Sequence, residues 1–183
     1  APGFEIAVRL SPAVPFAADA TAAAGEMGEL LIRPAGSERL EEVVVELTPV
    51  GVGKACLVRE ARVLPLGTFE LGGRGVVSLG TLLDEGEGRV ALSGFGVAVQ
   101  GAGRAFVLGT GHANGDFPAF ACDGERITLT FTPQRALAPG ERFRVLIGLG
   151  TDLYGVLADY GAALGREARP LRDGLAAPCV SGT

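Results

Sequence analysis

The residue best suited to acid–base or nucleophilic chemistry is His112, the single histidine of the chain. An imidazole titrates near neutral pH, and a Ser-His-Asp or Cys-His site would have to use it. It lies in the glycine-rich stretch of residues 109–116, and the chain has neither a Gly-x-Ser-x-Gly turn nor a cysteine in a helix-start context. We therefore expect His112 to be a solvent-exposed loop residue and the protein not to be an enzyme.

The three cysteines, Cys56, Cys122 and Cys179, are the next candidates for chemistry. Their spacing matches no Cys-x-x-Cys pattern, and one histidine with scattered cysteines does not complete a zinc site. A free cysteine in a secreted tail is a chemical liability, whereas a disulfide would anchor the tail. We therefore predict a disulfide between Cys122 and Cys179, with Cys56 buried as a small apolar residue.

Hard oxygen ligands gather in one turn-rich region, which makes calcium the cofactor to consider. The candidate ligands are Asn114, Asp116, Asp123 and Glu125. They do not form the EF-hand run of alternating Asp or Asn residues. Two interpretations stay open: a calcium site, or ordinary turn residues in a protein that has no cofactor.

Paired carboxylates occur at residues 41–42 and 84–87, and glycosidases need two carboxylates that face each other across a sugar. Both pairs lie in polar turns ahead of predicted strands, where acidic residues are common. Sandwiches that bind sugars usually offer exposed aromatic rings, but this chain has no tryptophan, and Tyr154 and Tyr160 fall on a predicted helix. Glycan binding is therefore the weaker interpretation.

Composition and charge limit the partners. The 183 residues carry a formal net charge of −5, with 48% hydrophobic and 20% charged residues, which is typical of a globular domain with a sizeable core. No basic cluster is present, so nucleic acid is disfavoured as a partner. No apolar run approaches about 18 residues, so we expect no insertion into a membrane.

The elements that must position these residues begin with residues 4–10, whose strict period-two alternation predicts a β-strand. The apolar face of this strand consists of Phe4, Ile6, Val8 and Leu10, and the polar face carries Glu5 and Arg9. Prolines and an alanine-rich stretch follow as far as Gly25. We therefore predict a strand and linker arm over residues 1–27, in which residues 17–25 form a linker or crossing segment, and a sandwich over residues 28–183.

Further short strands follow, with glycine and proline between them. They are predicted at residues 29–33, 42–48, 54–64, 75–79, 89–100, 104–108, 126–132 and 143–149. Eight or nine such strands are typical of an all-β sandwich of the immunoglobulin-like or jelly-roll kind. Gly94 and Gly96 predict a bulge or bend in the long segment 89–100, and residues 101–103 predict a tight hairpin. Cys122 is expected in a loop.

One amphipathic helix is predicted near the C-terminus, over residues 151–166. Thr151 and Asp152 can cap the start of the helix, and Pro170 prevents it from continuing. Its apolar stripe consists of Leu153, Val156, Leu157, Tyr160 and Leu164. We expect this stripe to pack on the sandwich, and the tail from residue 171 onward to be irregular.

Two sequence phrases carry a resemblance. "GSERLEEVVVELTP" (residues 36–49) and "ALAPGERFRVLIGLG" (residues 136–150) resemble the turn-and-strand phrases of bacterial extracellular immunoglobulin-like modules. The resemblance covers about half of the chain, and it implies a β-sandwich at the cell surface or in a secreted assembly, with no particular chemistry. The N-terminal arm and the helix near the C-terminus depart from that pattern.

These observations together lead us to expect a non-enzymatic structural subunit of an extracellular or cell-surface assembly, such as a filament, pilus or surface layer. The start Ala1-Pro2-Gly3 fits a chain after signal cleavage, and it also fits simple removal of an initiator methionine before a small residue; of the two we expect secretion. Copies of the chain itself are the expected partners, either through exchange of the strand at residues 4–10 or with that strand paired in its own sheet. The alternatives are a secreted calcium- or glycan-binding accessory module and an all-β virion protein.

Overall fold

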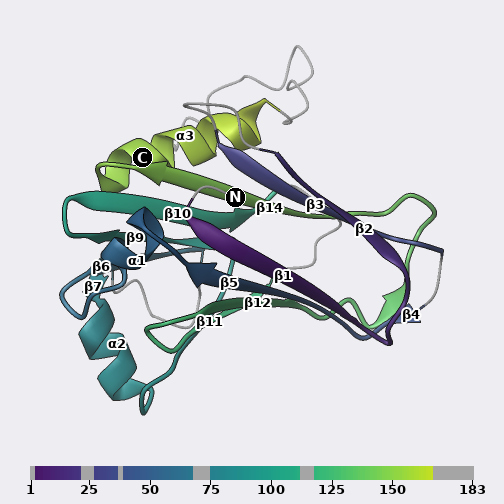
Figure 1. The fold of residues 1–183 in the computed structure, drawn as a ribbon, viewed down its shortest axis with the longest axis horizontal. Helices are drawn as coiled ribbons and strands as arrows, with labels where there is room; N and C mark the ends of the chain where they lie inside the picture. The colour runs from purple at the N-terminus through teal and green to yellow at the C-terminus, as the bar shows by residue number, and fades with distance from the viewer. Residues whose placement is uncertain (1–2, 22–26, 37–38, 68–74, 112–117, 167–183) are drawn as a thin grey trace, which may run out of the picture.

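The computed structural model describes residues 3–21, 27–36, 39–67, 75–111 and 118–166. Antiparallel strands in two facing sheets make up most of this part, and one long helix lies outside them (Figure 1). The structure confirms a mostly β, sandwich-like architecture of antiparallel sheets with a helix near the C-terminus, whereas the immunoglobulin-like or jelly-roll type stays a prediction. The described residues hold fourteen strands, more than the eight or nine expected, because strands of two to four residues show no readable alternation.

Each sheet is antiparallel throughout, and each is built from strands far apart in the sequence. The five-stranded sheet has the order β1 (Phe4–Ser11), β5 (Glu42–Pro49), β12 (Ile127–Phe131), β11 (Ala119–Cys122) and β8 (Val90–Ser93). The seven-stranded sheet has the order β2 (Phe16–Thr21), β3 (Gly28–Pro34), β14 (Phe143–Gly150), β10 (Arg104–Thr110), β9 (Gly96–Gly101), β6 (Arg62–Leu66) and β7 (Val77–Ser78). A two-stranded sheet joins β4 (Arg39–Leu40) to β13 (Arg135–Ala136).

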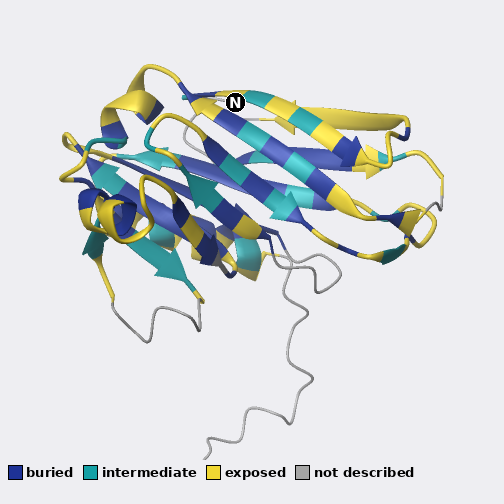
Figure 2. Cartoon of the chain, turned by 90° about the horizontal axis from the view of Figure 1, so that it is seen from below, coloured by how far each residue is buried: buried dark blue, intermediate teal, exposed yellow. Residues whose placement is uncertain are grey.

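The main hydrophobic core lies between the two large sheets. Val43, Val45 and Leu47 of β5 are fully buried in it, whereas the residues between them are more exposed, as a strand with one solvated face requires. The same alternation appears as stripes along several strands in Figure 2. The seven-stranded sheet differs, because β9, β10 and β14 are buried on both faces.

The second face of the seven-stranded sheet is covered by α3 (Leu153–Gly165), which confirms the predicted helix. Asp152 is its N-cap, and the carboxylate accepts a hydrogen bond from the Gly155 N–H at 2.8 Å. Leu153, Val156 and Tyr160 are buried against the sheet. Packing of this apolar stripe holds a helix that Gly155 and Gly161 would otherwise weaken.

The long strand expected over residues 54–64 is wrong. The chain forms α1 (Val52–Cys56) instead and returns to the sheet only at β6. Gly51, with φ of 51°, turns the chain sharply after β5. Gly53 then lies against the backbone of Gly3, where an added Cβ would come within 2.3 Å of the Gly3 carbonyl oxygen. This close approach directs the chain into the short helix.

Three more segments differ from expectation. Residues 16–21 form strand β2 rather than a linker, so the expected arm supplies one strand to each sheet. Residues 79–85 form α2 (Leu79–Glu85), where only a turn was expected, because Ser78 caps the helix and three leucines are buried. Cys122 ends strand β11 instead of lying in a loop, because β11 pairs with both β12 and β8.

The glycine positions that predicted a bend and a hairpin are confirmed. Gly94, with φ of 154°, separates β8 from β9, and the chain passes there from the five-stranded to the seven-stranded sheet. Ala102 and Gly103 both have positive φ and form the two-residue turn between β9 and β10, in which Gly101 pairs with Arg104. Two positive φ values give the twist that a tight hairpin needs.

Candidate functional site

The two sides of the sandwich are protected very differently. On one side the sheets end in β1 and β2, strands of eight and six residues, and we call this the open side. On the other they end in β7 and β8, strands of two and four residues, and we call this the covered side. Proteins usually blunt a sheet edge by shortening it or covering it, because an uncovered edge can pair with another chain. Among the elements that the structure describes, those of the covered side alone follow that rule.

Helix α2 is what covers the second side. It connects β7 to β8 and buries Leu79, Leu82 and Leu83 in the main core. Its first turn is attached to the loop between α1 and β6. The N–H groups of Leu79 and Gly80 donate hydrogen bonds to the carbonyls of Ala61 and Arg59, respectively, each at 2.7 Å.

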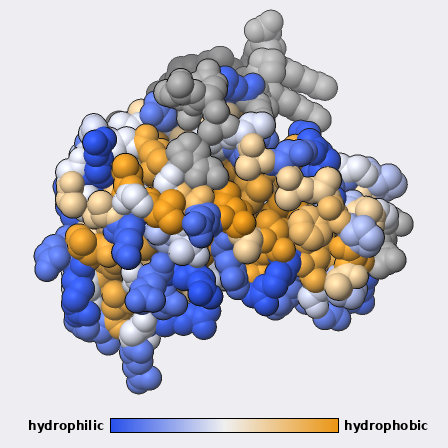
Figure 3. All heavy atoms as spheres, in the orientation of Figure 1, coloured by the Kyte–Doolittle hydropathy of each residue, from blue (hydrophilic) through white to orange (hydrophobic). Residues whose placement is uncertain are grey.

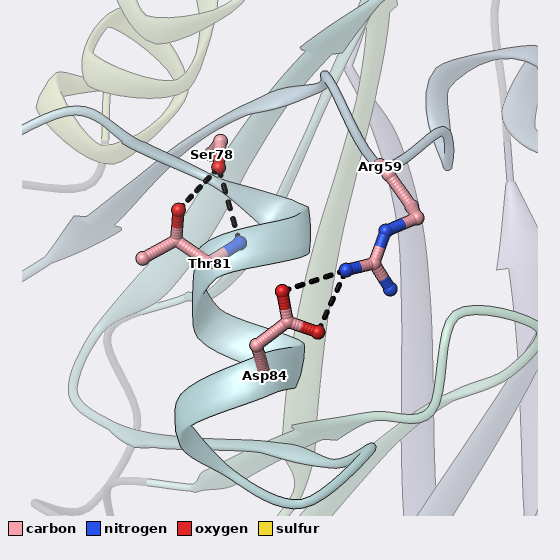
Figure 4. Close-up of polar contacts among 4 residues, drawn as sticks. All are labelled: Arg59, Ser78, Thr81 and Asp84. Carbon is pink, nitrogen blue, oxygen red and sulfur yellow. Dashed lines mark hydrogen bonds and ion pairs between the residues drawn. The ribbon is translucent and has the colours of Figure 1, made fainter.

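Side chains strengthen this attachment (Figure 4). The Ser78 hydroxyl accepts a hydrogen bond from the Thr81 N–H at 3.1 Å, which satisfies the start of α2. One guanidinium nitrogen of Arg59 donates to both carboxylate oxygens of Asp84, at 2.6 and 2.7 Å. Asp84 of the predicted carboxylate group thus helps to hold α2 in place.

The apolar row predicted on the first strand lies on the inner face of β1. Phe4 and Leu10 are buried at its two ends, and Ile6 and Val8 are half-buried between them. The strand pairs with β5 of its own chain over eight residue pairs, from Phe4 with Pro49 to Ser11 with Glu42. The first strand therefore completes its own sheet in this structure.

The backbone of β1 shows which groups face the open side. The Val50 N–H donates to the Gly3 carbonyl at 2.9 Å, so Gly3 and Val50 are a hydrogen-bonded pair in the β1–β5 register. In antiparallel strands such pairs alternate with non-hydrogen-bonded ones. Ile6 and Val8 consequently direct their N–H and C=O groups away from β5, toward the open side.

Strand β2 adds a second uncovered edge. All six of its residues are exposed, including Phe16, which is 40% exposed. Ala18 and Ala20 pair with Ile32 and Leu30 of β3, which are buried, so these alanines continue the inner face of the sheet beyond the covered core. Sequence reasoning missed β2, because six exposed residues leave no alternation to read.

The open side is apolar across both strands. Figure 3, in the orientation of Figure 1, shows hydrophobic residues gathered in the region where β1 and β2 lie. Charged residues lie on the outer faces of these strands. Arg9 of β1 forms an ion pair with Glu46 of β5, and Asp19 of β2 forms an ion pair with Arg33 of β3. Glu5 is also exposed on the outer face of β1.

The predicted calcium ligands are only partly placed. Asn114 and Asp116 lie outside the described residues, as does His112. One Asp123 carboxylate oxygen accepts hydrogen bonds from the N–H groups of Glu125 and Arg126, at 2.9 and 2.7 Å. Partial burial raises the pKa of Asp123, but these backbone donors and the Arg126 charge outweigh it and hold the pKa below its usual range. Asp123 thus closes its own turn.

No group of three or more His, Cys, Asp or Glu side chains that could hold a metal ion occurs in the described ranges. Cys56 and Cys122 are free thiols, and burial raises the pKa of each. Cys56 is fully buried, as predicted. Cys179 lies outside the described residues, and the predicted disulfide between Cys122 and Cys179 is not supported, because Cys122 carries a free thiol in this structure.

One cavity lies within the main core, near the covered side. It measures about 30 Å³ and is lined by apolar side chains and Cys122, which leaves a trapped molecule no polar group to bind. Of the two tyrosines, Tyr154 is 72% exposed on α3 and Tyr160 is buried. Within the described residues, we take the unpaired strand edges of the open side as the candidate binding surface.

Comparison with known proteins assigns no family. No protein-family model matches the chain, and no curated protein is significantly similar to it. Among the helices of the described residues, none is both long and apolar enough to cross a bilayer.

Proposed function

We propose that this protein is a non-enzymatic structural subunit that assembles with copies of itself through the open side, in a secreted or cell-surface structure. The observation that carries the proposal is the contrast between the two sides. One pair of sheet edges is short and covered by a helix, whereas the outer edges of β1 and β2, strands of eight and six residues, pair with no described strand.

The chemistry of the open side supports the same conclusion. Outward N–H and C=O groups supply main-chain hydrogen bonds, and the half-buried Ile6 and Val8 with the exposed Phe16 supply apolar area beside them. That combination is how proteins bind an added strand.

Strand addition fits this surface better than exchange of the first strand. Exchange would withdraw Phe4, which is 3% exposed, from the core and would break the eight-residue pairing with β5. Addition of a strand at the open side leaves both in place. Assembly by edge pairing is therefore the form of self-association that we propose.

Sedimentation velocity over a wide range of protein concentrations tests the proposal. We expect the wild-type protein to associate as its concentration rises. Ala18→Lys places a charge on the open side without filling the core, and it should weaken association. Tyr154→Lys, on the outer surface of α3, has a comparably exposed position and should not. A wild-type protein that stays monomeric at millimolar concentration, or equal loss in both variants, would refute the proposal.

A further inference from the structure

We propose that two copies of the chain join through β1, antiparallel about a two-fold axis at Ala7, so that two five-stranded sheets become one sheet of ten strands. This inference rests on the proposed function and specifies its partner and register. The partner is a second copy of this chain, and the pairing sets residue i of one β1 against residue 14 − i of the other.

The backbone permits this register. Ile6 and Val8 direct their N–H and C=O groups toward the open side, as derived from the Val50–Gly3 hydrogen bond. The two-fold axis at Ala7 places Ile6 of one copy opposite Val8 of the other, so groups that can form hydrogen bonds meet each other. Registers that shift one copy by a single residue set these groups against residues whose own groups point toward β5.

Charge selects one register among those that remain. With the axis at Ala7, Glu5 of each copy lies opposite Arg9 of the other, which gives two opposite-charge pairs. An axis at Ile6 or at Val8 leaves both charges opposite uncharged residues. An axis at Glu5 or at Arg9 sets like charges against each other, which is destabilising.

The geometry of the charged pair is favourable as well. Glu5 and Arg9 would form non-hydrogen-bonded pairs, the type in which opposed side chains come closest. The Arg9 side chain is 69% exposed, so its guanidinium can contact a partner's carboxylate while it retains Glu46 of its own chain. On the inner face the same register sets Phe4 against Leu10 and Ile6 against Val8, which extends one apolar row across both copies.

The symmetry has a definite consequence. A two-fold interface uses the same patch on both copies and closes on itself, so β1 alone gives a dimer and no longer polymer. The edge of β2 stays available for further association.

Charge reversal tests the register. Glu5→Arg sets arginine against arginine twice, and Arg9→Glu sets glutamate against glutamate twice. Each should weaken dimerisation, measured by sedimentation equilibrium, roughly tenfold or more at low salt, because two favourable cross-strand pairs become unfavourable. The double variant Glu5→Arg with Arg9→Glu should restore it. An equimolar mixture of the two single variants should form a mixed dimer, because every opposed pair then has opposite charges.

Two controls keep the result specific. Glu125→Arg changes the net charge as Glu5→Arg does but lies in an exposed turn, and it should leave the dimer unaffected. Thermal melts of each variant show whether Arg9→Glu, which also faces Glu46, still folds; Arg9→Gln replaces it if not, and should weaken the dimer less. If the wild type dimerises but the single variants do so equally well, or the mixture forms no mixed dimer, the register is wrong while the proposed function stands. A wild type that never associates overturns both.

Discussion

Tyr160 lies so close to Gly109 that a Cβ at Gly109 would come within 2.4 to 2.5 Å of three atoms of the tyrosine side chain. The phenol hydroxyl of Tyr160 donates a hydrogen bond to the carbonyl of the next residue, Thr110, at 2.9 Å. A residue of α3 is thereby fixed to the backbone of β10. The helix is seated by a specific contact as well as by its apolar stripe.

Substitution of Gly109 should therefore loosen the helix. Gly109→Ala forces the Tyr160 ring to move and should lower the free energy of unfolding by about 1–3 kcal/mol, as overpacking does. Gly161→Ala is the matched control, because no atom lies within 4 Å of a Cβ there, and it should raise stability by about 0.5–1 kcal/mol. Urea denaturation measures both. Equal changes in stability in the two variants would contradict the idea that the Tyr160 ring leaves no room for a side chain at position 109.

Stability should fall at alkaline pH because of Tyr160. Burial raises the pKa of its phenol from 10.0 to about 12, although the hydrogen bond with Thr110 lowers it in part. The unfolded chain then releases this proton near pH 10, whereas the folded protein keeps it until about pH 12. The stabilising contribution is complete below pH 10 and is lost as the pH rises toward 12.

The size of the loss is at most about 3 kcal/mol, since each pKa unit corresponds to about 1.4 kcal/mol. Denaturation curves between pH 8 and 12 measure it. Tyr160→Phe cannot ionise at this position, so its stability should decline less steeply over that range, whatever its stability at pH 8. Parallel declines in both proteins would contradict the assignment.

The buried stripe of α3 should be sensitive to charge in proportion to burial. Val156 is 1% exposed, so Val156→Asp should cost at least about 3 kcal/mol by burying an unpaired carboxylate. Leu157 is half-buried, so Leu157→Asp should cost less. Asp159→Asn, on the exposed face, should change stability by no more than about 0.5 kcal/mol. Thermal melts that rank these three differently would show that the helix packs on another face.

A half-buried ion pair should stabilise the turn between β13 and β14. Glu141, whose side chain is 4% exposed, accepts hydrogen bonds from two nitrogens of Arg135 and from the Ala138 N–H at 2.7 Å. Glu141→Ala should cost about 1–3 kcal/mol, because it leaves the arginine without its buried acceptor. Glu125→Ala, in an exposed turn, serves as the comparison and should be nearly neutral. Chemical denaturation that finds no difference would contradict this role.

Strands with one buried face leave the clearest pattern in the sequence. β1, β5 and β12 alternate between apolar and polar residues, and alternation is what a half-buried strand requires. β2 has no buried face and α1 depends on the approach of Gly53 to Gly3, a contact between segments about fifty positions apart. No local pattern encodes such a contact.

For the candidate site too, the local pattern could be predicted from the sequence, but the position of the strands in the sheets could not. The apolar row of β1 was visible in the sequence, because Phe4, Ile6, Val8 and Leu10 recur with period two. That β1 lies at an edge, next to the edge of β2 and away from α2, follows from the order of strands in both sheets. Strand order depends on long-range pairing, such as that of Glu29 in β3 with Leu146 in β14, and is not readable from either strand alone.

The position of β14 also bears on how a newly made chain matures. It lies between β3 and β10 in the seven-stranded sheet, yet it is the last strand along the described chain. During synthesis β3 has only β2 beside it until residue 150 has been added, and its Leu30 and Ile32 stay uncovered meanwhile. Such distant pairing slows folding. A ribosome that has not yet made β14 thus carries a chain that cannot close its sandwich, and factors that shield nascent chains should raise the yield of native protein.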